Sequence, residues 1–555
     1  MQHADLILTG GTVHTMDPAG PASDAIAITD GKITAVGSRE VATLRGPRTR
    51  HLDLAGRAVV PGFIDAHVHP LPAGLQMLTA DVSGTHSLEG YRRVISDFAR
   101  DNPGSEWVEG AGWYGDVFPG GFPHKDLLDE LVPNRPALLF SHDAHGAWVN
   151  SKALELAGID ARTADPDGGR IARDGRGEPT GMLFERAVDL VGRLIAPPDD
   201  DRIRRALLAS QEFLHRHGIT GWQDAAVGQA LGAPDPYPHY RALDQEGLLT
   251  ASVTGALWWE RERGLEQVDT FIARRAESTG RFRATAVKIM QDGVCENMTA
   301  AMTRPYQGHP HELGMRLVPA DELQIIAQTL DARGFDLHLH AVGDQAVRDC
   351  LDALDLSRRP GWDPRHQIAH LDLVDPADFA RFAELGVIAN IQPLWARRDP
   401  VLVETKLPLL DAAHQEVHFA FRRLQDSGAP VAMGSDWPVS SPDPLWGIHT
   451  AVNRTAPALD PHADDDRSRT DPLLPREALS LAAALHAYTS GAAHASRLDD
   501  RHGSIRAGMD ADLVVLDADP FAVEPQGLGD LQVDLTLAAG RVVYERSTDA
   551  HSVHH

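Results

Sequence analysis

The feature that most constrains the fold is an alternation of short apolar, strand-like runs with amphipathic, helix-like runs between residues 61 and 499. Residues 201–218 and 320–334 are two of the helix-like runs. Strands that alternate with helices predict βαβ units around a parallel sheet. The strand candidates are residues 63–69, 218–225, 250–259, 285–293, 335–344, 366–374, 387–393 and 431–439. Eight such strands predict an α/β protein built on a (β/α)8 TIM barrel.

The connection between the first two strand candidates spans residues 70 to about 217, far beyond an ordinary loop. It predicts a large insert after the first barrel strand, within a barrel domain of residues 61–499. Residues 1–60 and 500–550 show strand–turn–strand patterns, with turns such as Gly10-Gly11 and Asp30-Gly31. Neither terminal segment is long enough to bury a core alone. We therefore expect both to form one small composite β-sandwich domain.

The stretch VVPGFIDAHVHP, residues 59–70, predicts half of a metal site. We interpret Val59 to Ala66 as one buried strand that ends in His67 and His69. Residues two apart on a strand point to the same face, so both imidazoles can reach one point. Imidazole is a common ligand of zinc and similar ions. A lone His-x-His is a weak signal among 28 histidines, but this pair follows a strand-like run that contains Asp65.

Further polar residues fall at the ends of later strand candidates, where barrel enzymes carry their reactive groups. They are Lys288, His340 with His338 two residues earlier, His370 and Asp436. Each has a simpler interpretation. Lys288 could extend to solvent, His370 could be a core histidine, Asp436 could be a turn or N-cap residue, and His338 fits the core or a supporting role better than a ligand. Their repetition at successive strand ends favours a single site.

The motifs PGFIDAHVH, HAVGD from His340, IAH ending at His370 and GSDWPV around Asp436, together with Lys288, resemble the amidohydrolase superfamily of metal-dependent hydrolases. The segments 141–154 (SHDAHGAWVNSKAL) and 340–347 (HAVGDQAV) are similar to the branch that includes N-substituted formamide deformylases and related amidohydrolase-3-type enzymes. The resemblance extends over essentially the whole chain. Its motifs are specific for the superfamily and much less so for a substrate.

The resemblance implies a role for each matching residue. His67 and His69 would bind a buried metal ion, and Asp436 would bind the same ion and shuttle protons. Lys288, carboxylated by CO₂, would bridge to a second ion held by His340 and His370. One or two divalent ions are implied, with Zn²⁺ favoured and Mn²⁺ or Fe²⁺ compatible with the same ligands.

The implied reaction is hydrolysis of an amide-type C–N bond in a small molecule, such as an amide or N-substituted formamide. A metal-bound hydroxide would attack the carbonyl, and Asp436 would pass the proton to the leaving amine. One alternative is a deaminase or cyclic-imide hydrolase on the same scaffold, and a mononuclear version would not need a carboxylated Lys288. Another is a non-catalytic ligand-binding homologue.

The insert is expected to contribute the substrate pocket, because it combines flat aromatic faces with polar tips. The candidates are Trp113, Tyr114, His142, Trp148 and, after Lys288, Asp292, with Asn297 and Arg304 less favoured. His145 is the candidate catalytic group that would hydrogen-bond the substrate carbonyl. The aromatic residues could instead pack the insert. Within it, residues 136–158 predict a strand, a histidine-rich turn and a helix capped by Asn150 or Ser151.

The net charge, the cysteine count and the N-terminal sequence limit the kinds of partner and the compartment that we expect. A formal net charge of −27 argues against binding nucleic acid or an anionic membrane. Two cysteines, Cys295 and Cys350, do not make a disulfide framework, and the N-terminus lacks the pattern of a secretory signal, so we expect a cytoplasmic protein. No uncharged apolar run is long enough to span a bilayer. A homodimer is a common state for such enzymes, but the sequence leaves oligomeric state, metal and substrate open.

Overall fold

The computed structural model describes residues 3–20, 22–142, 146–230, 232–278, 280–463 and 465–547. The chain divides into two compact units. The barrel unit comprises residues 1–70 and 211–555, and the insert unit comprises residues 71–210. Among the described residues no helix has both the length and the apolar character needed to cross a membrane.

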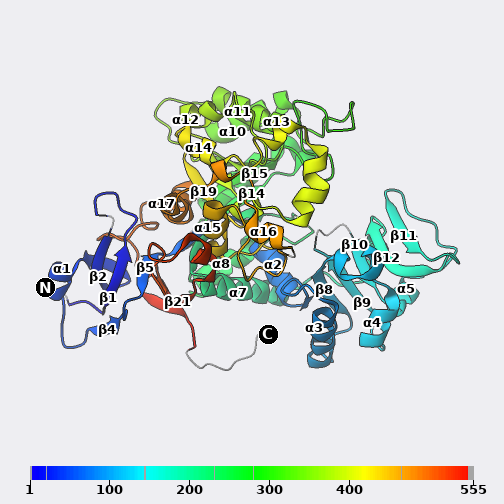
Figure 1. The fold of residues 1–555 in the computed structure, drawn as a ribbon, viewed down its shortest axis with the longest axis horizontal. Helices are drawn as coiled ribbons and strands as arrows, with labels where there is room; N and C mark the ends of the chain where they lie inside the picture. Colours follow the sequence, from blue (N-terminus) through cyan, green and yellow to red (C-terminus); the bar gives the residue numbers. More distant parts are fainter. Residues whose placement is uncertain are drawn as a thin grey trace. The chain divides into compact units, whose positions relative to one another are not determined.

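The barrel unit contains a parallel sheet of eight strands, each of which overlaps one predicted strand. Figure 1 labels β14, β15 and β19 of this sheet. The strands are β6 (Phe63–Val68), β13 (Ile219–Val227), β14 (Ser252–Trp258), β15 (Phe282–Met290), β16 (Asp336–Ala341), β17 (Gln367–His370), β18 (Ile388–Ile391) and β19 (Val431–Met433). They neighbour one another in chain order, from β6 to β19. The predicted α/β fold of the TIM-barrel type is confirmed.

A helix lies between each two successive barrel strands. These helices are α7 (Asp200–Arg216), α8 (Tyr237–Gln245), α9 (Val268–Ala276), α10 (Ala320–Ala332), α11 (Asp344–Ser357), α12 (Phe379–Leu385) and α14 (Phe421–Asp426). The last strand is followed by α15 (Pro444–Asn453), α17 (Leu481–His486) and α18 (Ala492–Ala495). The two predicted helices correspond to α7 and α10. Each is followed by a glycine with positive φ, Gly218 at 77° and Gly334 at 75°. Glycine adopts this left-handed conformation without steric cost, which explains where both helices stop.

The first and last barrel strands meet beyond their regular ladders. Asp436 N donates to His67 O at 2.8 Å, and His69 N donates to Trp437 O at 2.9 Å. Gly434 makes this approach possible, because a Cβ atom there would lie 2.5 Å from His67 N. Closure of the barrel therefore brings the segment after β19 directly against the two predicted histidine ligands.

The prediction of one buried strand from Val59 to Ala66 is wrong. The segment forms β5 (Ala58–Pro61) and β6, which belong to different sheets. The break falls at Gly62, whose N–H donates to Asp512 O at 2.8 Å, and a Cβ atom there would lie 2.2 Å from Thr220 Oγ1. The residue preceding it, Pro61, has no N–H to donate to a ladder. The chain therefore changes sheet between Pro61 and Phe63.

The two ends of the chain share one mixed sheet of eight strands. These are β1 (Leu6–His14), β2 (Ala22–Thr29), β3 (Lys32–Val36), β4 (Arg50–Asp53), β5, β20 (Leu513–Leu516), β21 (Val533–Ala538) and β22 (Arg541–Glu545). The termini meet where β5 pairs antiparallel with β20, with Val59 opposite Val515. Both valines are fully buried, in a cluster with residues from both ends of the chain. A two-sheet sandwich forming its own domain stays a prediction.

The insert unit is built on a six-stranded sheet in the order β11-β12-β10-β9-β8-β7. Its strands are β7 (Ala80–Asp81), β8 (Val108–Trp113), β9 (Ala137–Ser141), β10 (Gly146–Val149), β11 (Gly169–Arg173) and β12 (Pro179–Glu185). Its helices include α3 (Leu88–Asp101), α4 (Lys125–Leu131) and α5 (Ser151–Ala157). Asn150 is the N-cap of α5 and accepts from Ala153 N, as one of the two predicted caps.

Candidate metal centre

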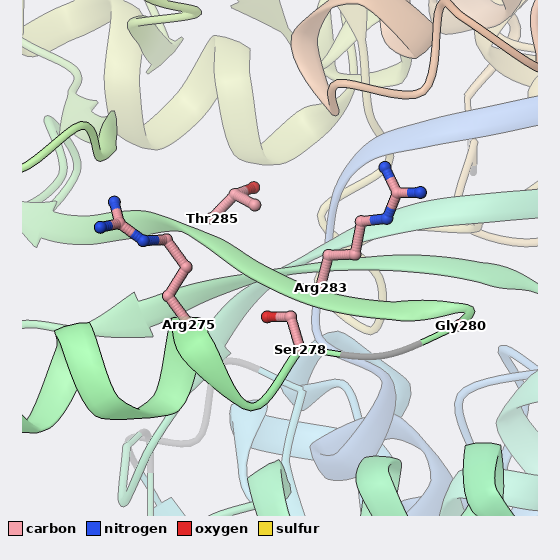
Figure 2. Close-up of a pocket in the computed structure, with 5 residues that line it drawn as sticks. All are labelled: Arg275, Ser278, Gly280, Arg283 and Thr285. Atoms are coloured by element: carbon pink, nitrogen blue, oxygen red, sulfur yellow. The ribbon is translucent and has the colours of Figure 1, made fainter.

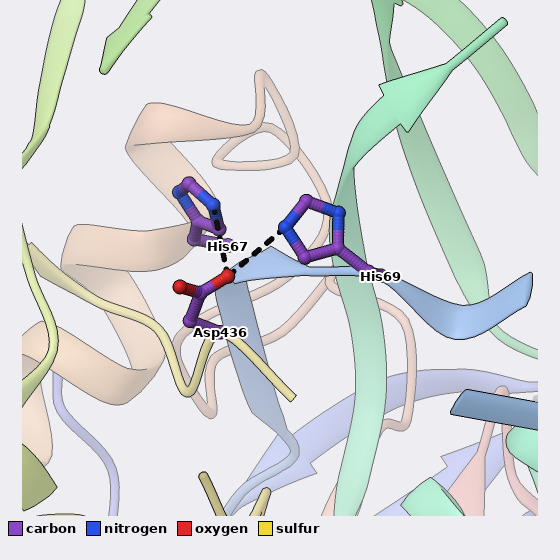
Figure 3. A group of neighbouring side chains, drawn as sticks. All are labelled: His67, His69 and Asp436. Atoms are coloured by element: carbon purple, nitrogen blue, oxygen red, sulfur yellow. Dashed lines mark ion pairs between the residues drawn. The ribbon is translucent and has the colours of Figure 1, made fainter. Parts of the chain in front are cut away.

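His67 and His69, at the C-terminal end of β6, approach the carboxylate of Asp436 (Figure 3). Nε2 of His69 lies 2.9 Å from Asp436 Oδ1, and Nε2 of His67 lies 3.3 Å from the same oxygen. The three residues are buried, and one ligand atom from each lies within 4.8 Å of the others. Nε2 of His67 has no hydrogen-bond partner among the described residues. Two imidazole nitrogens and a carboxylate oxygen so placed fit a divalent ion.

Electrostatics favour the protonation states that a metal needs. Burial holds the pKa of His67 well below its usual value, with the charge of Lys288 acting in the same direction. Burial by itself would raise the pKa of Asp436, but the hydrogen bond and charge of His69 hold it below its usual value. Neutral imidazole and ionised carboxylate are the ligating forms of these side chains.

The backbone of the segment after β19 is fixed by Asp65, which sequence reasoning noted only as part of a motif. Its Oδ1 accepts from the backbone N–H groups of His67 and Ser435, both at 3.0 Å, and its Oδ2 accepts from Ser435 Oγ at 2.6 Å. Burial raises the pKa of Asp65 to about 7. Asp436 itself has a φ of 58°, an uncommon conformation outside glycine. Asp65 therefore ties together the two segments that carry the ligands.

Lys288 and His338 face this group from neighbouring strands. They are paired in the ladder between β15 and β16, and Lys288 is 2% exposed. Burial lowers the pKa of Lys288 to about 7, against the opposing charge of Asp436. His338 Nε2 lies 2.8 Å from His67 Nδ1. A hydrogen bond at one imidazole nitrogen orients the ring and fixes its tautomer, so this contact fits a supporting role for His338, which stays a prediction.

His340 and His370 lie beside the first group. Their ring centroids are 4.4 Å apart, and the His370 ring is 4.8 Å from that of His67. The His370 ring also stacks on Trp395, with an interplanar angle of 5°, and its backbone has a φ of 80°. His340 Nε2 lies 3.3 Å from Gly293 O. The predicted ligands of a second ion are thus close to the first group, although the tight cluster contains only His67, His69 and Asp436 among the described residues.

Asp292, predicted to bind substrate, is fully buried and accepts three backbone hydrogen bonds. Its Oδ1 accepts from Val342 N at 3.0 Å, and its Oδ2 accepts from Gly343 N at 2.8 Å and Ala301 N at 3.0 Å. It ties the segment after β15 to the end of β16. Of the less favoured candidates, Arg304 forms an ion pair with Asp411, and Asn297 is exposed. Contact of any of them with substrate stays a prediction.

The predicted pocket residues of the insert belong to the insert unit. Trp113 and Trp148 are buried in its core, where their indole N–H groups donate to Leu139 O at 2.9 Å and His124 O at 3.1 Å. Tyr114 stacks on His142, with ring centroids 3.9 Å apart. His145, the predicted partner of the substrate carbonyl, lies outside the described residues.

Comparisons with known proteins identify the family of this chain. The model of the Amidohydrolase family matches residues 50–544. The chain is 30% identical to the N-substituted formamide deformylase of Arthrobacter pascens over 98% of this chain and 99% of that protein. It is 31% identical to the Arabidopsis thaliana Protein LONG AFTER FAR-RED 3 over 92% of this chain and 87% of that protein.

Among solved structures, the fold is similar to that of an uncharacterized metal-dependent hydrolase from Pyrococcus horikoshii OT3. The TM-score is 0.72 at 23% identity, covering 94% of this chain and 99% of that chain. The family match spans most of the barrel unit, including every residue of the metal cluster. The chain therefore belongs to the amidohydrolase family and is a hydrolase that acts on carbon–nitrogen bonds.

Proposed function

We propose that this protein hydrolyses a small N-substituted formamide or a related amide, with a divalent ion held by His67, His69 and Asp436. The observation that carries the proposal is the buried cluster of three ligand atoms within 4.8 Å. When bound, such an ion lowers the pKa of a water molecule toward neutrality and polarises a carbonyl group. The similarity to an N-substituted formamide deformylase over nearly the whole chain supports this substrate class.

Asp436 is the group we assign to proton transfer. An amide nitrogen leaves poorly as an anion, so the reaction needs a proton on that nitrogen when the C–N bond breaks. The Asp436 carboxylate would accept a proton from the attacking water and deliver it to the amine. Its low pKa and its buried position beside His69 fit a carboxylate that is ionised at the start of the cycle.

We further propose that Lys288, carboxylated by CO₂, takes part with His340 and His370 in holding a second ion, with Zn²⁺ favoured at both positions. Carboxylation would convert a buried amine into an anionic ligand with two oxygens. The burial of Lys288 and the 4.4 Å separation of the His340 and His370 rings support this arrangement. A protein with one ion and an unmodified lysine would favour the deaminase or cyclic-imide alternative.

The test combines metal analysis, intact mass and a substrate panel. Protein purified with bicarbonate is expected to contain two ions per chain and to gain the mass of one CO₂, which a Lys288→Arg variant should lack. The panel compares N-alkyl formamides, N-alkyl acetamides, a cyclic imide and an aminopyrimidine, with amine or ammonia release as the readout. Preference for the formamides supports the proposal. Preference for the imide or aminopyrimidine, or no metal after reconstitution, would overturn it.

A further inference from the structure

A cavity of about 290 Å³ lies near the start of β15, beside the C-terminal end of α9 (Figure 2). It is lined by Arg275, Ser278, Gly280, Arg283 and Thr285. Lys288 of the metal centre lies further along the same strand, toward its C-terminal end. The lining residues play no part in the proposed hydrolysis.

The cavity is lined by two positively charged guanidinium groups, in a chain whose formal net charge is −27. Its described lining includes no carboxylate, although the charge of Asp336 acts on Arg275, and a Cβ atom at Gly280 would lie 2.6 Å from Asp244 Oδ2. Neither arginine forms an ion pair with any described residue, whereas the adjacent Arg274 pairs with Asp235 at 2.5 Å. Arg275 packs instead over the Phe335 ring, at 4.1 Å from the centroid. A guanidinium is always charged and offers several N–H donors, so both groups are suited to an anionic ligand.

Two hydroxyl groups add neutral donors. Thr285 Oγ1 is buried without a hydrogen-bond partner among the residues described. Ser278 Oγ accepts from Ala284 N at 2.9 Å, and accepting that bond leaves its own O–H as a donor. The ladder with β14 shifts register beside these residues, since Thr254 pairs with Arg283 but Ala256 pairs with Ala286. Such a bulge redirects side chains away from the regular alternation of a strand.

The arrangement of the two arginines restricts the ligand. Figure 2 shows their guanidinium groups on opposite sides of Thr285, extending from α9 and β15 rather than converging on one point. A compact monoanion would engage one group at a time. A ligand with two separated acidic groups could pair with both arginines and accept from Thr285 between them.

We propose that this cavity binds a small dianion whose two acidic groups, carboxylates or phosphates, are separated along the molecule. Each acidic group forms a charge-assisted pair with one arginine, and the Thr285 hydroxyl donates to an oxygen of one of these groups. The cavity lies near the start of β15, whereas Lys288 lies near the C-terminal end of that strand, and none of the lining residues belongs to the metal cluster.

Isothermal titration calorimetry on the full-length protein at low salt tests the proposal. The probes are succinate and inorganic pyrophosphate, with acetate and inorganic phosphate as compact controls. We expect succinate or pyrophosphate to bind at least tenfold more tightly than acetate and phosphate. Tighter binding of succinate would identify carboxylates as the acidic groups, and tighter binding of pyrophosphate would identify phosphates. Arg275→Gln and Arg283→Gln should each weaken that binding about tenfold, the size expected for losing one charge-assisted pair.

Arg541→Gln is the matched control, because Arg541 lines a neighbouring cavity of about 240 Å³ that contains Asp244. This variant should bind like the parent protein. Arg275→Lys keeps the positive charge of the side chain. If this variant binds the probe more tightly than Arg275→Gln, the weaker binding of Arg275→Gln comes from the lost charge pair and not from misfolding. Metal content and amide turnover should be unchanged in every variant, so a failure here leaves the proposed hydrolysis intact. Equal binding of all four probes, or parental binding by both glutamine variants, would overturn the proposal.

Discussion

Two groups of buried polar side chains, one in the barrel unit and one in the insert unit, differ in their hydrogen bonding. In the barrel unit, His67, His69 and Asp436 converge within 4.8 Å, and His67 Nε2 has no hydrogen-bond partner among the described residues. In the insert unit, the indole N–H groups of Trp113 and Trp148 are both satisfied by backbone carbonyls. Buried polar atoms are normally hydrogen-bonded, so imidazole nitrogens that converge on one carboxylate oxygen without all being satisfied fit a ligand site, whereas the two indoles need no further partner.

Asn150, in the insert unit, is an example of a buried polar side chain whose hydrogen bonds are all satisfied. Its Oδ1 accepts from Ala137 N and Ala153 N, and its Nδ2 donates to Val132 O and Arg135 O. This satisfies all the hydrogen-bonding positions of an amide side chain. In the barrel unit, by contrast, Asp436 and His370 adopt positive φ angles of 58° and 80°. Strained backbone at converging polar residues is common at functional sites.

The largest expected effect is on turnover, in Asp436→Asn. An amide keeps the shape of the side chain but cannot accept the proton, so kcat/KM should fall by about 10²- to 10⁴-fold. Metal content, measured by mass spectrometry, should be retained because an amide oxygen can still ligate. Asp426→Asn, an exposed carboxylate of α14 ion-paired to Arg422, is the control and should match the parent. Undiminished turnover in Asp436→Asn would remove this residue from the mechanism.

The second prediction concerns the free energy of unfolding of two variants, Trp148→Ala and Trp222→Ala. Trp148 in the insert unit is 0% exposed, and Trp222 in β13 is 1% exposed. Each change to alanine should lower the free energy of unfolding by about 3–5 kcal/mol, because it leaves a large cavity. Urea unfolding measures this cost. Trp148→Ala should keep the parental metal content under native conditions, because the ligands belong to the barrel unit, and loss of metal would show that the metal centre depends on the packing of the insert unit.

The barrel was predictable because its signals are local and repeated. Each strand candidate carries its own apolar run, and His67, His69, Lys288, His340, His370 and Asp436 lie at or near the C-terminal strand ends, where barrel enzymes carry their reactive groups. The division of residues 58–68 into β5 and β6 has one local signal, the Pro61-Gly62 dipeptide, but both halves are buried throughout, so the run resembles a single interior strand. The long-range pairing of β5 with β20, over 450 residues away in the sequence, separates them.

Supporting residues were harder to predict than ligands. The supporting contacts join the first barrel strand to the segment after the last one, and they involve Asp65, Ser435 and Gly434. Spacing in the sequence does not show that these segments meet. The aromatic residues of the insert show the reverse difficulty. Trp113 and Trp148 have the composition of a pocket lining, but composition does not say whether an indole N–H already has a partner. Only the observed hydrogen bonds to Leu139 O and His124 O answer that question.

The third prediction concerns the closure of the barrel, in Gly434→Ala. The added Cβ would lie 2.5 Å from His67 N and 2.8 Å from His67 Cβ, so the segment carrying Asp436 must move away from β6. We expect a cost of about 1–3 kcal/mol in unfolding free energy, typical of overpacking, together with weaker metal binding. Gly527→Ala is the control, since a Cβ there meets nothing within 4 Å. Competition with a chelator measures the metal affinity, and parental affinity would show that the approach of these segments is not needed for the site.

The smallest effect is expected for His142→Ala in the insert unit. His142 is exposed, and its ring stacks on Tyr114 with centroids 3.9 Å apart. Loss of one aromatic pair costs about 0.5–1.5 kcal/mol, so thermal unfolding should shift only slightly. Kinetics then separate the two interpretations of the insert aromatics. A raised KM with unchanged metal content would support a pocket lining, whereas unchanged KM and kcat with only the small stability loss would place His142 and Tyr114 with Trp113 and Trp148 as packing of the insert.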